Sequence, residues 1–172
     1  DLISTFPRGE LRDYLGMVST GEVSIAVKPQ YIDKLPRIFD GEVRELLARV
    51  DDRGEIENYT ELMGISHILD RKLGDLSGGE LQRVAICATL LKEADVYFFD
   101  EPSSYLDIYE RMRMVGVVRE LAEKGKRVLV VEHDLAILDV LCDLIHVIYG
   151  ERSAYGIFTP PRSTRTALNA YL

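Results

Sequence analysis

The segment LSGGELQRVAICATLL, residues 76–91, contains a helix start that includes two adjacent glycines. Ser77 and Glu80 fit the capping box, in which a serine hydroxyl accepts a backbone N–H and a glutamate three residues later reaches back to the serine. Apolar residues then recur with the spacing of one helix face, namely Leu81, Val84, Ala85, Ala88 and Leu91. The segment therefore predicts an amphipathic helix that begins at Ser77.

Gly78 and Gly79 are the unusual feature of this helix start. Gly costs roughly 1 kcal/mol relative to Ala inside a helix, and a cap needs only the serine. One explanation is a simple serine-glycine turn before the helix. The other is that bare N–H groups at a helix N-terminus, with its partial positive charge, bind a phosphate closely because no Cβ intervenes. On this segment alone, both explanations stay open.

The composition suits a globular domain or a part of one. The chain has 172 residues, of which 47% are hydrophobic and 29% charged, and its formal net charge is −8. This acidic balance argues against a protein that coats nucleic acid by bulk electrostatic attraction. Cys87 and Cys142 lie far apart without a CxxC motif, so we expect buried free thiols in a reducing compartment. The sequence has no run of about 18 apolar residues and no signal-peptide pattern, which predicts a soluble, cytoplasmic protein.

Two short apolar runs, each followed by charged residues, organise the second half of the chain. They are DVYFFDEP, residues 95–102, and KRVLVVEHD, residues 126–134, with a helical pattern over about residues 105–124 between them. Strand, helix and strand in this order predict a right-handed βαβ unit with parallel strands. We also expect a helix over residues 9–18, a strand within 22–30, short helices near 41–49 and 56–64, a hairpin of strands 143–150 and 154–159, and a final helix over 163–172.

Polar residues follow both strands of this unit. Asp100 and Glu101 end the first strand, and Glu132 and His133 end the second. Ligands of open α/β sheets bind beyond the carboxyl ends of the strands, so we expect these side chains to gather at one edge. Gln30 lies at the exit of the strand predicted before them.

These residue types suit nucleotide hydrolysis. Asp100 can hold Mg²⁺, usually through a water, while Glu101 can polarise the water that attacks a γ-phosphate. His133 can hydrogen-bond the terminal phosphate or that water, and the amide oxygen of Gln30 can complete a Mg²⁺ shell. Taken one at a time, solvent-facing acids in a turn and a structurally satisfied histidine explain the same residues.

The order of these motifs resembles that of the ATP-binding-cassette (ABC) ATPases. In that resemblance Gln30 matches the Q-loop, LSGGE the signature and Asp107 the D-loop. Asp100 matches the Walker B aspartate, Glu101 the catalytic glutamate and His133 the switch histidine. The resemblance implies an α/β fold of the P-loop NTPase type, with a helical signature subdomain beside a parallel-strand core, and it implies ATP and Mg²⁺ as cofactors.

The same resemblance gives the signature residues a role in a second site. They are Ser77, Gly78, Gly79 and Glu80. In the family, such residues close over the γ-phosphate of an ATP held by the partner half of a head-to-tail pair. The bare backbone would then serve a ligand that another cassette holds.

The phosphate loop of the family, G-x-x-x-x-G-K-[ST], does not occur in the sequence. The single Gly-Lys pair, at residues 125–126, has Glu120 where the first glycine belongs. That loop precedes the Q-loop in the family, so the sequence resembles the C-terminal part of a nucleotide-binding domain. Residues 1–162 would be this partial domain and 163–172 the start of a hinge. We expect this chain alone neither to bind ATP tightly nor to hydrolyse it.

The detailed sequence within and around these motifs resembles that of the ribosome-recycling branch of the family, the RNase L inhibitors, over nearly the whole chain. The D-loop region reads DEPSSYLD, residues 100–107, and the switch reads EHD, residues 132–134, where transporter ATPases usually carry DEPTSALD and THD. KPQYID, residues 28–33, and the tail AYGIFTPPRSTRTALNAYL, residues 154–172, also resemble that branch.

Membership of that branch implies a parent protein with two cassettes and an N-terminal domain holding two iron–sulfur clusters, whose cysteines are not in this sequence. ATP trapped between the halves would close them and split ribosomes into subunits, and hydrolysis would reopen them. The implied partners are the second nucleotide-binding domain of the same parent, the ribosomal small subunit and a release or rescue factor, with no membrane.

Three alternatives remain at this point. An ABC transporter subunit would use the same chemistry but needs a coupling surface for a membrane partner. A non-hydrolysing regulatory cassette often lacks one of the catalytic residues, whereas Glu101 and His133 are both present here. A repair or chromosome ATPase would place coiled-coil arms between the motifs, and the sequence has no sustained heptads.

Overall fold

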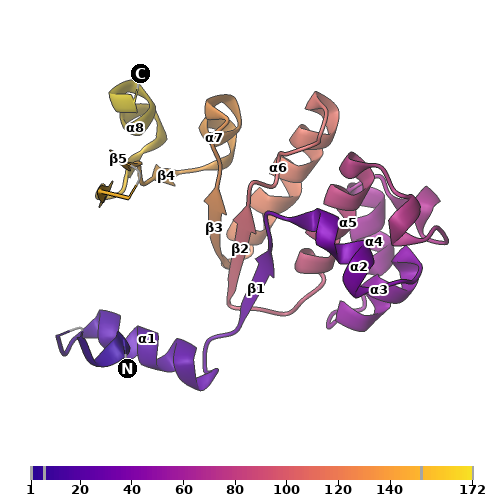
Figure 1. Ribbon diagram of the computed structural model, residues 1–172, viewed down its shortest axis with the longest axis horizontal. Helices are drawn as coiled ribbons and strands as arrows, with labels where there is room; N and C mark the ends of the chain where they lie inside the picture. The colour runs from indigo at the N-terminus through magenta and orange to yellow at the C-terminus, as the bar shows by residue number, and fades with distance from the viewer. Residues whose placement is uncertain (1, 6, 152, 172) are drawn as a thin grey trace. The chain divides into compact units, whose positions relative to one another are not determined.

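Three parallel strands form the central sheet of the computed structural model, which describes residues 2–5, 7–151 and 153–171. They are β1 (Ile25–Lys28), β2 (Val96–Asp100) and β3 (Arg127–Val131), in that spatial order (Figure 1). Helix α6 (Ile108–Glu123) joins β2 to β3. The predicted strand-helix-strand unit with parallel strands is therefore confirmed.

The chain divides into two compact units, Asp1–Val131 and Glu132–Leu172. The first unit contains the sheet and most of the helices. Besides α6, its helical segments are η1 (Leu2–Thr5), α1 (Glu10–Thr20), η2 (Ile32–Lys34), α2 (Leu35–Ile38), α3 (Val43–Val50), α4 (Ile56–Leu62), η3 (Ser66–Ile68), η4 (Leu73–Asp75) and α5 (Gly78–Leu90). The helices predicted near residues 9–18, 41–49 and 56–64 correspond to α1, α3 and α4, and the helix predicted to begin at Ser77 corresponds to α5.

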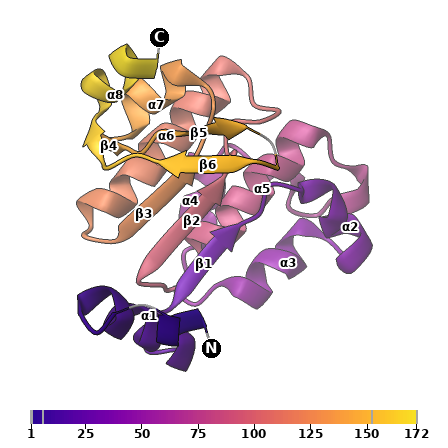
Figure 2. The same ribbon diagram turned by 60° about the vertical axis from the view of Figure 1, so that its left-hand side comes forward.

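The two faces of the sheet differ in burial because neighbouring residues of a strand point to opposite sides. One face is buried, with side chains at most 1% exposed at Ala26, Lys28, Tyr97 and Phe99. Helix α5 packs against β1 and α6 against β3 on this face, behind the strands in Figure 2. On the opposite face Val27 and Leu129 are 53% and 54% exposed. The sheet is therefore covered by its own helices on one side.

A helical cluster fixes the position of α5. Helices α3 and α4 pack against α5. Their contact region contains fully buried apolar side chains from several elements, namely Leu47, Met63, Ile65, Ile68, Ile86 and Leu90. Burying a side chain of this size contributes about 1.5–3 kcal/mol, so the cluster anchors α5 through the C-terminal half of the helix.

The single Gly-Lys pair forms a helix C-terminal turn. Gly125 adopts a left-handed conformation with φ +82° directly after α6, and its N–H donates to the carbonyl of Ala122 (2.9 Å). The Nζ of Lys126 donates to Glu93 and to the carbonyl of Ala94. This geometry agrees with the sequence argument that the pair is no phosphate loop.

The second unit has its own small core. Its elements are α7 (Leu135–Leu141), β4 (Leu144–Ile145), β5 (Ile148–Glu151), β6 (Tyr155–Phe158), β7 (Arg162–Ser163) and α8 (Thr164–Tyr171). Strand β4 pairs with β7, and β5 with β6, both antiparallel. Leu138, Ile145 and Ala167 are buried together. The predicted final helix is α8, and its predicted last residue, Leu172, lies outside the described residues.

The predicted hairpin is confirmed only in part. Strand 143–150 was expected to be continuous, but it divides into β4 and β5. The break lies at Val147, whose N–H donates to Oγ1 of Thr159 (2.8 Å), while the N–H of Thr159 donates to the carbonyl of Val147 (3.0 Å). His146 stacks on Phe158 at the same place. These local contacts interrupt the strand at Val147. As a result, β4 pairs with β7 and β5 pairs with β6.

The cysteine prediction holds for Cys87, which is a buried free thiol, whereas Cys142, also outside any disulfide, is only partly buried. Burial raises the pKa of the Cys87 thiol to about 12, so its reactive thiolate is suppressed. In the part of the chain that the structure describes, no helix has the length and hydropathy needed to cross a membrane. The predicted division at residue 162 stays a prediction.

We predict that Tyr97→Phe destabilises the fold by about 1–3 kcal/mol, because it leaves buried backbone groups without their partner. The hydroxyl of Tyr97 donates to the carbonyl of Lys92 and accepts from the N–H of Ala94. Urea denaturation measures the loss. Tyr109→Phe is the control, since Tyr109 is 80% exposed. Equal midpoints for the two variants would contradict this reading of the loop before β2.

Candidate functional site

The backbone at Glu101 makes a strained turn at the end of β2. Glu101 has φ +45°, a left-handed conformation that residues with a Cβ rarely adopt. Its N–H still pairs with β3, donating to the carbonyl of Val131 (2.8 Å). Non-glycine residues keep such conformations only where the surroundings impose them, and they concentrate at functional sites.

Two buried side chains hold the carbonyls of this turn. The Nζ of Lys28 donates to the carbonyls of Asp100 (2.8 Å) and Glu101 (3.3 Å). The Nε2 of Gln82 donates to the carbonyls of Glu101 and Pro102, both at 2.9 Å. Lys28 and Gln82 are each 0% exposed. The turn is therefore fixed from β1 on one side and from α5 on the other.

The carboxylate of Glu101 meets the predicted Q-loop residue. The Nε2 of Gln30 donates to Oε1 of Glu101 (2.9 Å), and Oγ of Ser104 donates to Oε2 (3.4 Å). An open cavity of about 310 Å³ lies here, with the exposed rings of Tyr31 and Tyr105 in its lining. Gln30, predicted at a strand exit, is thus in direct contact with Glu101 beside a space that a ligand can enter.

The signature residues form the predicted capping box. Ser77 is the N-cap of α5, and its Oγ accepts the N–H of Glu80 (3.3 Å). Oε2 of Glu80 accepts the N–H of Ser77 and its hydroxyl, both at 2.8 Å. Oε1 also pairs with Arg71 (2.9 Å). Hydrogen bonds from the backbone and hydroxyl of Ser77, followed by Arg71, hold the pKa of Glu80 below its ordinary value.

The glycine pair has a packing role that sequence reasoning did not foresee. A Cβ at Gly79 would lie 3.0 Å from the carbonyl oxygen of Tyr105, and a Cβ at Gly78 would lie 3.2 Å from the ring of Tyr105. Tyr105 itself adopts φ +64°. The turn after β2 therefore approaches the start of α5 so closely that a side chain at Gly79 would meet backbone. This close approach explains the glycines without a ligand and leaves phosphate binding as a proposal.

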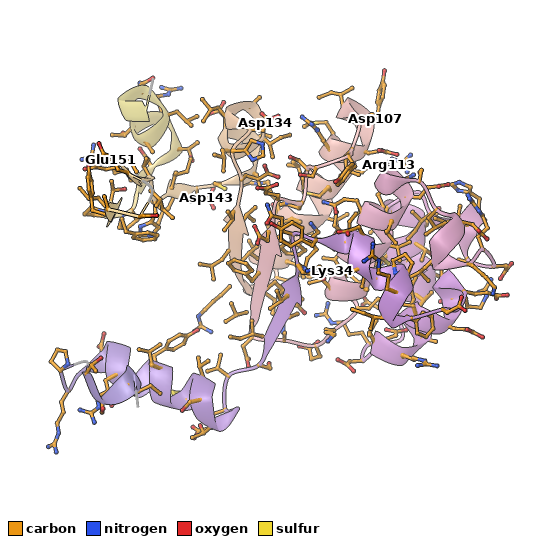
Figure 3. All side chains as sticks on the ribbon, in the orientation of Figure 1. Lys34, Asp107, Arg113, Asp134, Asp143 and Glu151 are labelled. Carbon is orange, nitrogen blue, oxygen red and sulfur yellow. The ribbon has the colours of Figure 1, made fainter. Side chains whose placement is uncertain are left out.

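Asp107 caps α6, and its capping partner Glu110 connects α6 to the signature helix. Its carboxylate accepts the N–H of Glu110 (2.9 Å), whose carboxylate accepts the N–H of Asp107 (3.1 Å), and Figure 3 shows Asp107 at the start of α6. Glu110 also pairs with Arg83 on α5 (3.0 Å), and Arg83 donates to the carbonyl of Gly64 after α4 (3.0 Å). One ion pair thus connects α5 and α6, and the same arginine reaches the helical cluster.

His133 belongs to the second unit, where its side chain is exposed. Next to it, Asp134 caps α7 by accepting the N–H groups of Ala136 (3.0 Å) and Ile137 (3.3 Å). The expected gathering of His133 and Glu132 with Glu101 at one edge stays a prediction.

The oxygen donors at the exit of β2 suit Mg²⁺. Asp100 offers a half-buried carboxylate and Gln30 an amide oxygen, both hard ligands. Among the described residues, no group of three or more His, Cys, Asp or Glu side chains could hold a metal ion. Mg²⁺ typically binds one or two protein oxygens together with substrate phosphates and waters, so these two residues fit an ion that arrives with a nucleotide.

Sequence reasoning missed Lys28 and Gln82, although a signal for Lys28 was available. In EVSIAVKPQ, residues 22–30, Lys28 has the same parity as the buried Ala26 and therefore faces the interior of the sheet. A lysine at an inward position of a strand indicates a specific partner. The sequence contains no comparable signal for Gln82, which occupies the buried side of an amphipathic helix.

Comparison with known proteins decides the family. The family model described as "ABC transporter" matches residues 10–104, more than half of the chain. The chain belongs to this family. A curated relative from Methanocaldococcus jannaschii, an uncharacterized ABC transporter ATP-binding protein, is 47% identical over 172 residues, and the Saccharomyces cerevisiae translation initiation factor RLI1 is 40% identical over 177. Both matches include the whole chain, which spans 28% and 29% of the relatives' lengths.

Solved structures of ABC proteins agree with the fold. The archaeal ribosome recycling factor aABCE1, in complex with the ribosomal stalk protein aP1, superposes with a TM-score of 0.95 at 50% identity over 99% of this chain and 33% of that one. A model of ribosome-bound archaeal Pelota and ABCE1 gives 0.91 at 53% identity over 99% and 29%. The predicted α/β ABC nucleotide-binding fold and the predicted resemblance to the recycling branch are confirmed.

We predict that Gly79→Ala destabilises the chain even though alanine favours helices, because its Cβ would press on the carbonyl of Tyr105. The control is Gly116→Ala in α6, where no atom lies within 4 Å of the added Cβ. We expect this control to stabilise by about 0.5–1 kcal/mol. Thermal unfolding compares the two, and equal stabilisation by both substitutions would exclude the close approach.

The cap of α5 makes stability depend on pH. Because the folded pKa of Glu80 is lowered, its contribution is complete above the unfolded pKa of about 4.3 and is lost as the pH falls through the folded value. Glu80→Gln should therefore lower the unfolding midpoint near neutral pH and converge with wild type once the pH falls below the lowered folded pKa of Glu80. Glu61→Gln, at an exposed position of α4, controls for the lost charge. A constant gap across this range would contradict the role of the carboxylate.

Proposed function

We propose that Glu101 is the catalytic base of an ABC-type ATP hydrolase and that this chain supplies parts of two ATP sites in a longer protein. The observation that carries the proposal is the left-handed Glu101, whose carboxylate accepts a hydrogen bond from Gln30 beside an open cavity. A carboxylate with one fixed partner and one open approach suits the alignment of a water for attack on a phosphate.

Each residue of the first site has a separable role. Glu101 polarises the attacking water and accepts its proton, while Gln30 fixes the direction of the carboxylate. Asp100 and Gln30 would hold Mg²⁺, which neutralises charge on the β- and γ-phosphates when bound. His133 would hydrogen-bond the terminal phosphate, and the phosphates themselves require a loop that this sequence lacks.

The signature residues would serve the second site. The N-terminus of α5 presents Ser77, Gly78, Gly79 and Glu80 around a positive helix end. Ser77 and Gly78 are exposed, which leaves them accessible to a nucleotide held by the partner cassette. Asp107, two residues after Tyr105, would contact that partner.

The cellular process we propose is the splitting of ribosomes into subunits. Support comes from whole-chain similarity to a translation initiation factor and to proteins solved with a ribosomal stalk protein and with Pelota on the ribosome. In the parent protein the partners would be its second nucleotide-binding domain, the ribosomal small subunit and a release or rescue factor. Iron–sulfur clusters would belong to a separate N-terminal domain, and the protein would act in the cytoplasm. Residues 1–162 and 163–172 would be the partial domain and the start of a hinge.

The test uses the full-length parent protein. Glu101→Gln should reduce ATP turnover by about 10²–10⁴-fold, because the amide cannot accept a proton. Sedimentation with ribosomal small subunits should still respond to a non-hydrolysable ATP analogue. Residues 1–172 alone should show no turnover.

Glu120→Gln, a surface position paired with Lys124, is the matched control and should retain wild-type turnover. Wild-type turnover in Glu101→Gln would overturn the assignment of the base. If the ATP analogue does not change how the parent protein sediments with small subunits, the proposed ribosomal role is overturned. The proposed ATPase chemistry would be unaffected by that result.

A further inference from the structure

Lys28 is a fully buried charged side chain inside the sheet. It is the last residue of β1 and lies beside Phe99 in the register of the two strands. Its exposed fraction is 0%. Burying an ammonium is costly unless polar partners replace its water, so a lysine at this position needs a specific arrangement to be tolerated.

Lys28 donates to two carbonyls at the exit of β2. Nζ lies 2.8 Å from the carbonyl oxygen of Asp100 and 3.3 Å from that of Glu101. These two carbonyl groups lie on either side of the N–Cα bond of Glu101, about which φ is +45°. An ammonium that binds both oxygens stabilises the left-handed turn against relaxation to an ordinary strand exit.

The neighbouring Gln30 contacts the side chain of Glu101, whose backbone Lys28 holds. Gln30 follows Lys28 after Pro29 and donates to the carboxylate of Glu101 (2.9 Å). One three-residue segment thus holds both the backbone and the side chain of Glu101. Because Pro29 restricts its own φ, the two contacts cannot vary independently over a wide range.

We propose that Lys28 is a positioning residue that holds the Glu101 turn in the geometry required for hydrolysis, an inference that rests on the proposed role of Glu101. Both hydrogen bonds described for Lys28 go to backbone carbonyls. It acts through the backbone: releasing the two carbonyls lets the turn relax and moves the carboxylate away from Gln30. Gln82 keeps its bond to the Glu101 carbonyl, so the loss of Lys28 misplaces the carboxylate without unfolding the sheet.

The experiment measures ATP turnover of the full-length parent with Lys28→Met, which keeps the length of the side chain and removes the donors. We expect kcat to fall about 10- to 100-fold, the cost of a catalytic group displaced by about 1 Å. The KM for ATP should change by less than about twofold. Lys124→Met, at an exposed lysine, is the matched control and should behave as wild type.

A double variant separates positioning from general damage. If Lys28 acts through the carboxylate, Lys28→Met should cause no further loss in the Glu101→Gln background, measured by single-turnover hydrolysis. An additional loss of the same size there would show a merely structural role and overturn the proposal. If Lys28→Met does not fold by circular dichroism, Lys28→Gln, which retains an amide donor, undergoes the same cycle.

The outcomes distinguish the two proposals. Wild-type turnover in Glu101→Gln removes the catalytic base and with it the proposed function. An inactive Glu101→Gln together with Lys28→Met that matches Lys124→Met overturns only the role of Lys28.

Discussion

The structure depends on one strained peptide turn at the end of the central strand. Glu101 is left-handed, and three elements hold it: β3 accepts its N–H, while β1 and α5 donate to its carbonyl. A strained conformation persists only when its surroundings favour it over relaxed alternatives. The buried donors Lys28 and Gln82 therefore have a reason to occupy interior positions where apolar residues would pack at lower cost.

The same turn determines the sequence at the start of α5. After Glu101 the chain passes so close to α5 that Gly79 faces the carbonyl of Tyr105. The serine cap, the glycines and the ion pair between Arg83 and Glu110 then fix the helix start against α6. The adjacent glycines, which suit ligand binding, are thus also required by packing. A ligand would bind to backbone that the fold already leaves without side chains.

Local patterns in the sequence predicted much of this arrangement. The parallel strands β2 and β3 and the capping box at Ser77 follow from periodicity and cap chemistry. The break at Val147 and the approach of Tyr105 to Gly79 could not be predicted, because they depend on which segments meet in three dimensions. Lys28 was visible as a charge at an inward position, yet only the structure identifies its partners as carbonyls.

The contacts of Gln82 have a consequence for how two ATP sites would communicate. Gln82 lies one helical turn after Gly79 on α5, and it donates to the carbonyl of Glu101. In the proposed function Gly79 would contact the ATP held by the partner cassette. The Glu101 turn would act on the ATP held by this one. A shift of α5 as the signature closes over one ATP would change the hydrogen bond that holds the catalytic turn of the other. Buried hydrogen bonds are short-range and directional, so even a small displacement of the helix would alter the orientation of the Glu101 turn. Coupling between the sites would then require no long pathway through the domain, because the signature helix and the catalytic turn share a single side chain.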